Sequence, residues 1–292
     1  MTTNDRLGYL GPHGTLSEEA AERFASALGV PPDGLVAHVS VPAALDDVRA
    51  GNTRWAVVPA ENSLEGSVGL TWDYLISTAE LAIAGEAVLP VVHHLLGKRG
   101  LKLGSVIAVL SHQQALGQCR AFLQSRLPRA KQYETASTAE AARVVSVNEL
   151  PLAAVGSERA ARLYGLDILE RNIQDVAENA TRFLLVGRAA EPVEPTGCDR
   201  TSLVCALERD RPGALYQMLG VFAARGINLS RLESRPARKQ LGEYVFLIDA
   251  EGHAAVEPLA GALAELKEQG SLLRIIGSYP AVLPSHRLHL KD

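Results

Sequence analysis

Asn179-Ala180-Thr181-Arg182-Phe183 is followed directly by the apolar run Leu184-Leu185-Val186, so a polar loop turns into a buried strand at this point. Thr181 supplies a hydroxyl, and Arg182 supplies a fixed cation with several donors. A rigid scaffold presents polar groups to a ligand in this way, at the edge of a strand. The alternative is an ordinary strand start whose threonine and arginine are only solvated. Three polar clusters earlier in the chain favour the first interpretation.

Each of these clusters stands at the end of an expected apolar strand. The strands are predicted at residues 7–10, 55–59 and 106–110, and the clusters that follow are Gly11-Pro12-His13-Gly14-Thr15, Ala60-Glu61-Asn62-Ser63 and Ser111-His112-Gln113-Gln114. Thr15 stands three residues before Glu18, the spacing of a capping box for a helix that ends near Gly29. Ser111 can cap the next helix, on which Gln118 lies one turn after Gln114. A cap and turn would explain Asn62 or Ser63 but not also Glu61.

Strands and helices alternate throughout the first 188 residues, which predicts an α/β fold. Further strands are expected at residues 35–39, 81–89, 91–96, 133–136 and 153–156. Ligands of open α/β sheets bind outside the strand ends, so the polar clusters predict a ligand site there. Neighbouring strand residues face opposite ways, so His93 and His94 cannot hold one metal ion together. At most one of them can point into a cleft, and packing is the expected role of both.

A second domain is predicted after a proline-containing linker at residues 189–199. Over residues 200–281 the expected order is strand 201–207, helix 213–225, strand 227–234, strand 244–250, helix 256–269 and strand 272–279. This βαββαβ order is typical of a small ferredoxin-like sandwich. The tail at residues 282–292 shows no pattern, and we expect it to fray.

Composition limits the classes of partner. The 292 residues carry a formal charge of −4 from 29 basic and 33 acidic side chains, so neither nucleic acid nor an anionic membrane is an expected partner. Three cysteines fit no metal spacing and suit a reducing compartment. The N-terminus does not have the pattern of a signal peptide, and no apolar run approaches the roughly 20 residues of a membrane span. We therefore expect a cytoplasmic protein.

The motifs resemble those of the prephenate dehydratase family. The resemblance rests on the three clusters above, Gly66, Gln118-Cys119, Gln174-Asp175 and the stretch 179–183. The second domain resembles an ACT regulatory module through Arg211-Pro-Gly-Ala-Leu215, Gly226-Ile-Asn228, Glu233-Ser-Arg-Pro236 and Glu243-Tyr-Val-Phe246. The resemblance covers nearly the whole chain. It departs from the family at Leu16, usually an aromatic residue, at Gln113, usually proline, and at Tyr216, commonly valine.

The resemblance implies a catalytic domain at residues 1–188 made of two α/β lobes with a cleft between them, similar to type II periplasmic binding proteins. It also implies a monofunctional enzyme without the helical chorismate mutase domain of some relatives, because the chain begins at the first motif. The implied reaction converts prephenate to phenylpyruvate, water and carbon dioxide. Thr181 would assist the departing hydroxyl, and Glu61 is favoured over Asp175 as the source of a proton.

The implied site is built mainly of neutral donors, which can hold carboxylates without burying a charge. Arg182 either clamps a carboxylate or forms an internal ion pair. His112 is either a proton carrier or a packed side chain. No metal or organic cofactor is expected. The predicted catalytic residues are Thr181, Glu61, Asn62, Ser111 and Gln118, and the predicted substrate-binding residues are Thr15, Ser63, Gln114, Arg182 and Phe183.

Phenylalanine is the implied effector, bound between ACT domains that pair in a homodimer or homotetramer. The free N–H groups of the helix that begins at Gly213 suit its carboxylate. The predicted effector-binding residues are Gly213, Ala214, Leu215, Asn228, Leu229, Glu233 and Ser234. Two other functions stay open at this point: arogenate dehydratase, and a non-catalytic amino-acid sensor.

Overall fold

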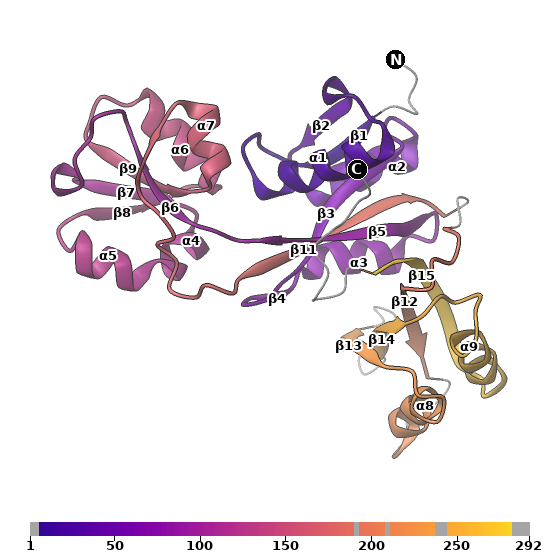
Figure 1. The fold of residues 1–292 in the computed structure, drawn as a ribbon. Coiled ribbons are helices and arrows are strands. Elements are labelled where there is room, and N and C mark those ends of the chain that lie inside the picture. The colour runs from indigo at the N-terminus through magenta and orange to yellow at the C-terminus, as the bar shows by residue number, and fades with distance from the viewer. Residues whose placement is uncertain (1–5, 190–192, 208–210, 237–243, 282–292) are drawn as a thin grey trace. The chain divides into compact units, whose positions relative to one another are not determined.

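The structure is a computed structural model, and it describes residues 6–189, 193–207, 211–236 and 244–281 (Figure 1). The predicted tail at 282–292 and residues 190–192 of the predicted linker lie outside the described residues. The α/β fold predicted up to residue 188 is present, but alternation is not strict: no helix separates strand 55–62 from 66–67, strand 81–90 from 94–97, or strand 167–170 from 180–188. Helix α1 illustrates the local signals: Glu18 N donates to the Thr15 hydroxyl at 3.3 Å, and Gly29 ends the helix with φ of 70°.

The first sheet has six strands in the order β2-β1-β3-β11-β5, with β4 paired to β3. Its strands and the helices among them are β1 (Leu7–Leu10), α1 (Leu16–Leu28), η2 (Pro32–Gly34), β2 (Leu35–His38), α2 (Val41–Ala50), β3 (Trp55–Asn62), β4 (Gly66–Ser67), α3 (Gly69–Ser77), β5 (Leu81–Pro90) and β11 (Ala180–Arg188). The carboxyl end of β3 lies beside the amino end of β11, because Ser63 N donates to Ala180 O at 2.9 Å. Val91 N donates to Asn179 O at 2.8 Å, which brings the end of β5 to the same point.

The second sheet has five strands in the order β10-β6-β9-β7-β8. Its elements are β6 (His94–Gly97), η3 (Leu103–Ser105), β7 (Ala108–Ser111), α4 (Gln113–Gln118), α5 (Arg120–Arg126), β8 (Lys131–Glu134), α6 (Thr138–Val147), β9 (Leu152–Gly156), α7 (Glu158–Tyr164) and β10 (Asp167–Glu170). Val109 packs in one apolar cluster, while Ala108 and Leu110 pack in another. Both faces of β7 are therefore covered, which explains its unbroken apolar sequence.

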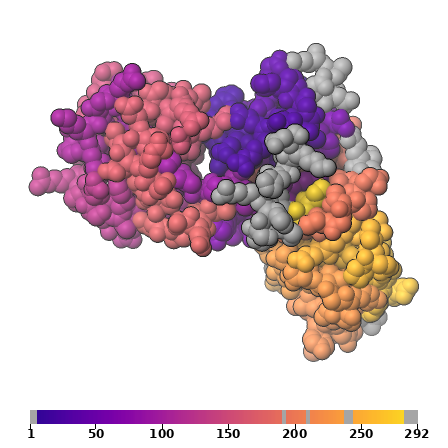
Figure 2. Space-filling view, viewed as in Figure 1, coloured from indigo at the N-terminus to yellow at the C-terminus, as the bar shows by residue number. Residues whose placement is uncertain are grey.

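The third sheet has four antiparallel strands in the order β13-β14-β12-β15. The order of elements is β12 (Asp199–Ala206), α8 (Ala214–Ala223), β13 (Leu229–Pro236), β14 (Tyr244–Glu251), α9 (Leu259–Glu268) and β15 (Leu272–Pro280), which is the predicted βαββαβ order. Leu203 and Ile248 of the sheet share one core cluster with Phe222 of α8 and Leu263 of α9. Both helices therefore cover the same face of the sheet. This domain is the orange-to-yellow part of Figure 2.

The chain forms two compact units. The first contains residues 1–44, 57–68 and 88–183, and the second contains residues 45–56, 69–87 and 184–292. The second unit thus joins the third sheet to α3 and to most of β5. All of the predicted catalytic and substrate-binding residues belong to the first unit.

Several details of the strand prediction differ from the structure, including the following three. The strand expected to end at residue 59 continues through Asn62, because Glu61 and Asn62 pair with Ser67 and Gly66 of β4. The strand expected at residues 133–136 is β8, which ends at Glu134. Strand β10 was not predicted: it is a short edge strand with an acidic residue at each end, so its sequence lacks an apolar run.

Candidate active site

The meeting of β3 with β11 places Asn62 beside Thr181. The Asn62 side-chain amide donates to Thr181 Oγ1 at 3.0 Å, to Asn179 Oδ1 at 2.8 Å and to Ala180 O at 3.2 Å. We call Asn62, Ser63, Asn179 and Thr181 the strand-end cluster. Because Thr181 Oγ1 accepts from Asn62, its own proton is free to point toward a ligand. Thr181 is half-buried, whereas Asn179 is 3% exposed.

Ser63 and Asn62 also fix the local backbone. The Ser63 hydroxyl accepts a hydrogen bond from Ala180 N at 3.0 Å and lies 3.3 Å from Asn179 Oδ1. On its other side, Asn62 Oδ1 accepts from Leu64 N at 3.0 Å and from Glu65 N at 3.2 Å. Asn62 therefore holds the turn between β3 and β4 with its oxygen and contacts Thr181 with its nitrogen.

The side-chain carbonyl oxygen of Gln118, on α4, is hydrogen-bonded to the strand-end cluster. Asn179 Nδ2 donates to Gln118 Oε1 at 3.1 Å, and His93 Nε2 lies 3.0 Å from the same oxygen. Burial lowers the pKa of His93, although the Gln118 hydrogen bond acts in the opposite direction. A neutral His93 that donates from Nε2 fits this contact. The sequence favoured packing for His93, with a position facing a cleft as the alternative, and its link to Gln118 was missed.

Glu65 was not predicted as a site residue, yet it joins the predicted glutamines. Gln118 Nε2 donates to Glu65 Oε1 at 3.3 Å, and Gln114 Nε2 donates to Glu65 Oε2. This confirms that Gln114 and Gln118 face the same side of α4. Its position in the turn after Ser63, next to a predicted polar cluster, could have identified Glu65 as a site residue.

Glu61 and Arg182 face each other from the neighbouring strands β3 and β11. Arg182 Nη1 lies 3.8 Å from Glu61 Oε2, and the two side chains are 10% and 42% exposed. Of the two roles considered for Arg182, the structure shows the ion pair.

Several predicted site residues have other partners in the structure. Ser111 is fully buried and donates to Val155 O at 2.7 Å, so the prediction that it caps α4 is wrong, and His112 is the cap. Phe183 is 1% exposed and belongs to the core. The Thr15 hydroxyl donates to Pro12 O at 2.9 Å and caps α1. The described contacts thus give Ser111, Phe183 and Thr15 structural roles and do not support direct binding of substrate.

Asp175, the second candidate proton source, is also a cap. Both of its carboxylate oxygens accept from Ala121 N, at 3.2 Å each, in the first turn of α5. Gln174 Oε1 accepts from His93 N at 3.2 Å. The Gln174-Asp175 motif therefore supports the backbone around His93 and α5.

The first motif surrounds a buried carboxylate. Glu18 Oε1 lies 2.7 Å from His13 Nδ1, and Glu18 Oε2 accepts from Gly14 N at 2.8 Å and from Arg159 Nε at 2.9 Å. Burial acts to raise the pKa of Glu18, but these hydrogen bonds outweigh it and hold the pKa below its usual value. Burial raises the pKa of Tyr9, and the neighbouring Glu18 carboxylate adds to this shift. This cluster ties α1 to α7 within the first unit.

The cysteines offer no reactive thiol in the described core. Burial raises the pKa of Cys119 to about 12 and that of Cys205 to about 11. Among the described residues, no three histidine, cysteine or acidic side chains gather as a metal site. None of the described helices is long and apolar enough to cross a membrane.

The predicted effector residues fall at two ends of the third sheet. Leu229 pairs with Ala250 and Ala250 with Thr201, whereas Arg235 pairs with Val245 and Val245 with Ala206. Asn228 and Leu229 therefore lie about 17 Å from the end of β12 that leads to Gly213, at about 3.4 Å per residue. One small ligand cannot contact both groups on a single chain. Gly213 begins α8 with φ of 84°, and Asn228 Nδ2 donates to Glu251 Oε1 at 2.7 Å.

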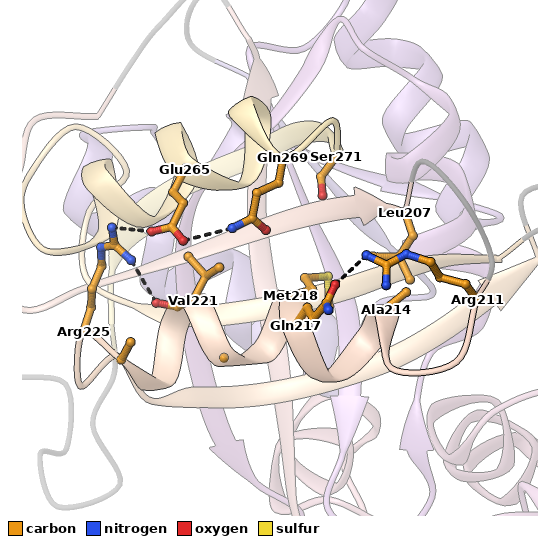
Figure 3. Close-up of a pocket in the computed structure, with 12 residues that line it drawn as sticks. Leu207, Arg211, Ala214, Gln217, Met218, Val221, Arg225, Glu265, Gln269 and Ser271 are labelled. Atoms are coloured by element: carbon orange, nitrogen blue, oxygen red, sulfur yellow. Dashed lines mark hydrogen bonds and ion pairs between the residues drawn. The ribbon is translucent and has the colours of Figure 1, made fainter.

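A cavity of about 550 Å³ lies between α8 and α9 (Figure 3). Of the predicted effector residues, Ala214 lines it. At one end Arg211 donates to Gln217 at 2.6 Å, and at the other Arg225 pairs with Glu265 at 2.6 Å. Met218 and Val221 contribute apolar surface between these pairs. The cavity was not foreseen because it joins residues far apart in the sequence.

The face of the third sheet away from its helices carries four arginines, which we call the arginine face: Arg200, Arg231, Arg235 and Arg274. Arg200 Nη1 lies 2.7 and 2.6 Å from the two oxygens of Glu86, which is buried in β5. The other three reach α3. Arg274 donates to Leu75 O at 2.7 Å and Thr78 O at 2.6 Å, Arg235 pairs with Asp73 at 3.2 Å, and Arg231 stacks 4.2 Å from the Trp72 ring.

Polar groups collected at strand ends of an α/β region, followed by a βαββαβ domain, place the chain in the class of ligand-binding α/β proteins with a C-terminal ferredoxin-like domain. Sequence comparison gives the family. Residues 7–191 match the family described as prephenate dehydratase, and residues 201–268 match the ACT domain. The chain belongs to the prephenate dehydratase family.

Individual relatives agree with this assignment. The prephenate dehydratase of Amycolatopsis methanolica is 42% identical, with 94% of this chain and 88% of that protein covered. The crystal structure of prephenate dehydratase from Arthrobacter aurescens in complex with L-Phe is 38% identical with a TM-score of 0.83, covering 98% and 94% of the two chains. A solved structure described as GqqA, a novel type of quorum-quenching acylase, is 33% identical with a TM-score of 0.83, covering 94% and 98%.

Proposed function

We propose that the strand-end cluster is where this chain, a carbon–oxygen lyase of the prephenate dehydratase family, converts prephenate to phenylpyruvate. The observation that carries the proposal is the hydrogen bond from Asn62 to Thr181 Oγ1, at 3.0 Å. It orients the Thr181 hydroxyl so that its proton can be donated to the hydroxyl that leaves the substrate. Such a donor lowers the barrier because the charge it meets develops in the transition state.

The chemistry needs little else from the protein. The bond between the ring and its carboxylate breaks, its electron pair makes the ring aromatic, and hydroxide departs from the opposite carbon. One proton converts that hydroxide to water, and carbon dioxide is the third product. The protein must hold two carboxylates, assist the leaving hydroxide and limit bulk water.

For the carboxylates we propose the neutral donors Gln114, Gln118 and Ser63. Their side chains are partly or fully exposed, and they come from the turn after β3 and from α4. Neutral donors can bind a dianion, and they leave no unpaired buried charge when the site is empty. For the proton we propose Glu61 over Asp175, because both oxygens of Asp175 are already used to cap α5.

The geometry favours a lyase over the acylase activity ascribed to the GqqA structure. Acyl transfer needs a nucleophile activated by an adjacent base. Thr181 faces an amide donor, the Ser111 hydroxyl is donated to Val155 O, and the pKa of Cys119 is raised to about 12. None of these three groups is an activated nucleophile.

We propose phenylalanine as the effector, because the chain carries an ACT domain and the relative from Arthrobacter aurescens was solved with L-Phe. We propose that the effector binds between two copies of the domain, in a homodimer or homotetramer. The separation of Asn228 from Gly213 on one chain supports this, because only a second copy can bring both groups to one ligand. We also propose that the protein works in the cytoplasm.

The test is turnover of prephenate by the purified protein, followed through phenylpyruvate, with arogenate as the competing substrate. We expect Thr181→Ala to lower kcat by about 10²- to 10³-fold, as when one transition-state donor is lost. Thr181→Ser, which keeps the hydroxyl, should retain far more activity. Equal rates for wild type and Thr181→Ala would show that Thr181 has no part in the mechanism. Faster conversion of arogenate than of prephenate would show that arogenate is the preferred substrate.

A further inference from the structure

Gln114 and Gln118 present a ready-made place for a carboxylate. The Gln118 carbonyl oxygen is held by Asn179 Nδ2 at 3.1 Å and lies 3.0 Å from His93 Nε2. Its amide nitrogen must therefore point away from the buried side, as a donor. Gln114 lies one turn earlier on α4 and directs its own amide nitrogen to the same carboxylate.

In the structure this place is taken by the protein's own carboxylate. Glu65 Oε1 accepts from Gln118 at 3.3 Å, and Glu65 Oε2 accepts from Gln114. The two oxygens of one carboxylate are thus bound by two amides, which is the arrangement a substrate carboxylate would need. Glu65 reaches them from the turn that Asn62 holds through Leu64 N and Glu65 N.

We infer that Glu65 is a specificity-determining residue whose carboxylate occupies the position of a substrate carboxylate and is exchanged for it on binding. The inference rests on the proposed function, because it takes the ligand to be a dicarboxylate. A ligand without a carboxylate in this position cannot replace the contacts that Glu65 gives up. A ligand that has a carboxylate in this position makes the same contacts with Gln114 and Gln118. The exchange therefore favours dicarboxylate ligands over those with a single carboxylate elsewhere.

The exposure of Glu65 makes the exchange feasible. Glu65 is exposed, so its carboxylate is solvated by water once it leaves the glutamines. The turn itself stays fixed by Asn62, because those hydrogen bonds go to backbone N–H groups and not to the Glu65 side chain. Rotation of one side chain therefore opens the place without moving the strand-end cluster.

Steady-state kinetics of Glu65→Gln with prephenate provide the first test. Removing the internal competitor should lower KM about three- to tenfold, the size expected for one charged hydrogen-bonded contact, while kcat changes less than twofold. Glu149→Gln is the matched control, because it removes the same charge from an exposed ion pair with Lys98. An unchanged or raised KM, or a tenfold loss of kcat, would overturn the inference.

A binding measurement separates this inference from the proposed function. In protein labelled with ¹⁵N-glutamine, the side-chain signals of Gln114 and Gln118 should move in ligand-free Glu65→Gln and stay in place in Glu149→Gln. If wild type forms no phenylpyruvate, the proposed function fails, and titration of both proteins with prephenate still decides the role of Glu65. Half-saturation at a lower prephenate concentration in Glu65→Gln supports the exchange, and equal or weaker binding contradicts it.

Discussion

The strand-end cluster and the arginine face both hold polar groups in fixed positions, but they use opposite chemistry. Around Thr181 the contacts are made by neutral amides and hydroxyls, with Asn62 Nδ2 within 3.2 Å of three oxygens. On the arginine face every contact involves a cation, and Glu86 lies fully buried against Arg200. In the proposed function, the strand-end cluster receives a charged ligand and releases it. The arginine face instead makes permanent contacts with α3 and β5.

This difference has an energetic reason. A neutral amide loses little when its site is empty, because water or a nearby side chain such as Glu65 can accept its hydrogen bonds. A buried charge loses far more when its partner is removed, since it cannot be solvated in place. Permanent contacts can therefore use buried ion pairs, whereas a binding site that empties in each cycle is better built from amides.

The largest expected effect comes from breaking the buried pair. Arg200→Met leaves Glu86 without its cation, which should lower the free energy of unfolding by about 3–5 kcal/mol. The double variant Glu86→Leu/Arg200→Met, which removes both charges, should recover most of this loss. Denaturant titrations of the three proteins measure it. If Arg200→Met unfolds with the same free energy as wild type, the contact between Arg200 and Glu86 does not stabilise the protein, and the proposed difference between the two regions is wrong.

A smaller effect is expected where the arginine face touches α3. Asp73→Asn weakens the 3.2 Å contact with Arg235, which in turn lies 2.5 Å from the predicted effector residue Glu233. Helix α3 begins two residues after β4, so this contact can carry the effector's influence toward the turn at Asn62. We expect about fivefold or greater loss of inhibition by phenylalanine, within the usual range of coupling energies, with kcat unchanged.

Asp46→Asn is the control for this experiment, because it removes an exposed partner of Arg49 and Tyr74 in the same unit. Inhibition constants for phenylalanine and rates with prephenate should be measured together for both variants. Undiminished inhibition in Asp73→Asn would show that the arginine face only docks the domain and does not transmit the signal.

The smallest effect concerns the neutral side chains that contact the strand-end cluster. Burial lowers the pKa of His93 below its ordinary value of about 6.5, so the unfolded chain binds a proton that the folded protein does not. Stability is therefore complete above about pH 6.5 and falls as the pH drops toward the folded pKa, by at most about 1.4 kcal/mol per pH unit. His93→Gln should lose less stability than wild type between about pH 7.5 and about pH 5.5. Equal losses in denaturant midpoint would mean that His93 is protonated in the folded state.

The two regions also differ in how far the sequence predicted them. Asn62, Gln118 and Thr181 could be found because Asn62 ends an apolar strand, Gln118 lies on the helix after one, and Thr181 stands where an apolar strand begins. The arginine face gave no such signal. Arg200 and Arg274 come from different strands, and their partners Glu86 and Leu75 belong to the region before the linker. Only the docked domain brings these residues together.

Single residues show the same limit within the catalytic region. Ser111 matched the family motif, yet its hydroxyl bonds to Val155 O on β9, a pairing that depends on the order of strands in the second sheet. His93 and Glu65 gain their roles from Gln118, which lies far from both in the sequence. Sequence patterns predict which segments meet, but the partner of each polar atom is set by the packing of side chains.

The most direct test of the central claim, that neutral donors around Thr181 form the active site, is kcat/KM for prephenate in Asn62→Asp. The change keeps the shape and the acceptor for the turn but replaces the donor to Thr181 with a negative charge. We predict a loss of about 100-fold or more, as for removal of one preorganised donor. Asn148→Asp, the same change at the half-buried residue that follows α6, should stay within about twofold of wild type, because the side-chain oxygen that accepts from Leu150 N is kept. Near-normal activity of a folded Asn62→Asp protein would contradict the account.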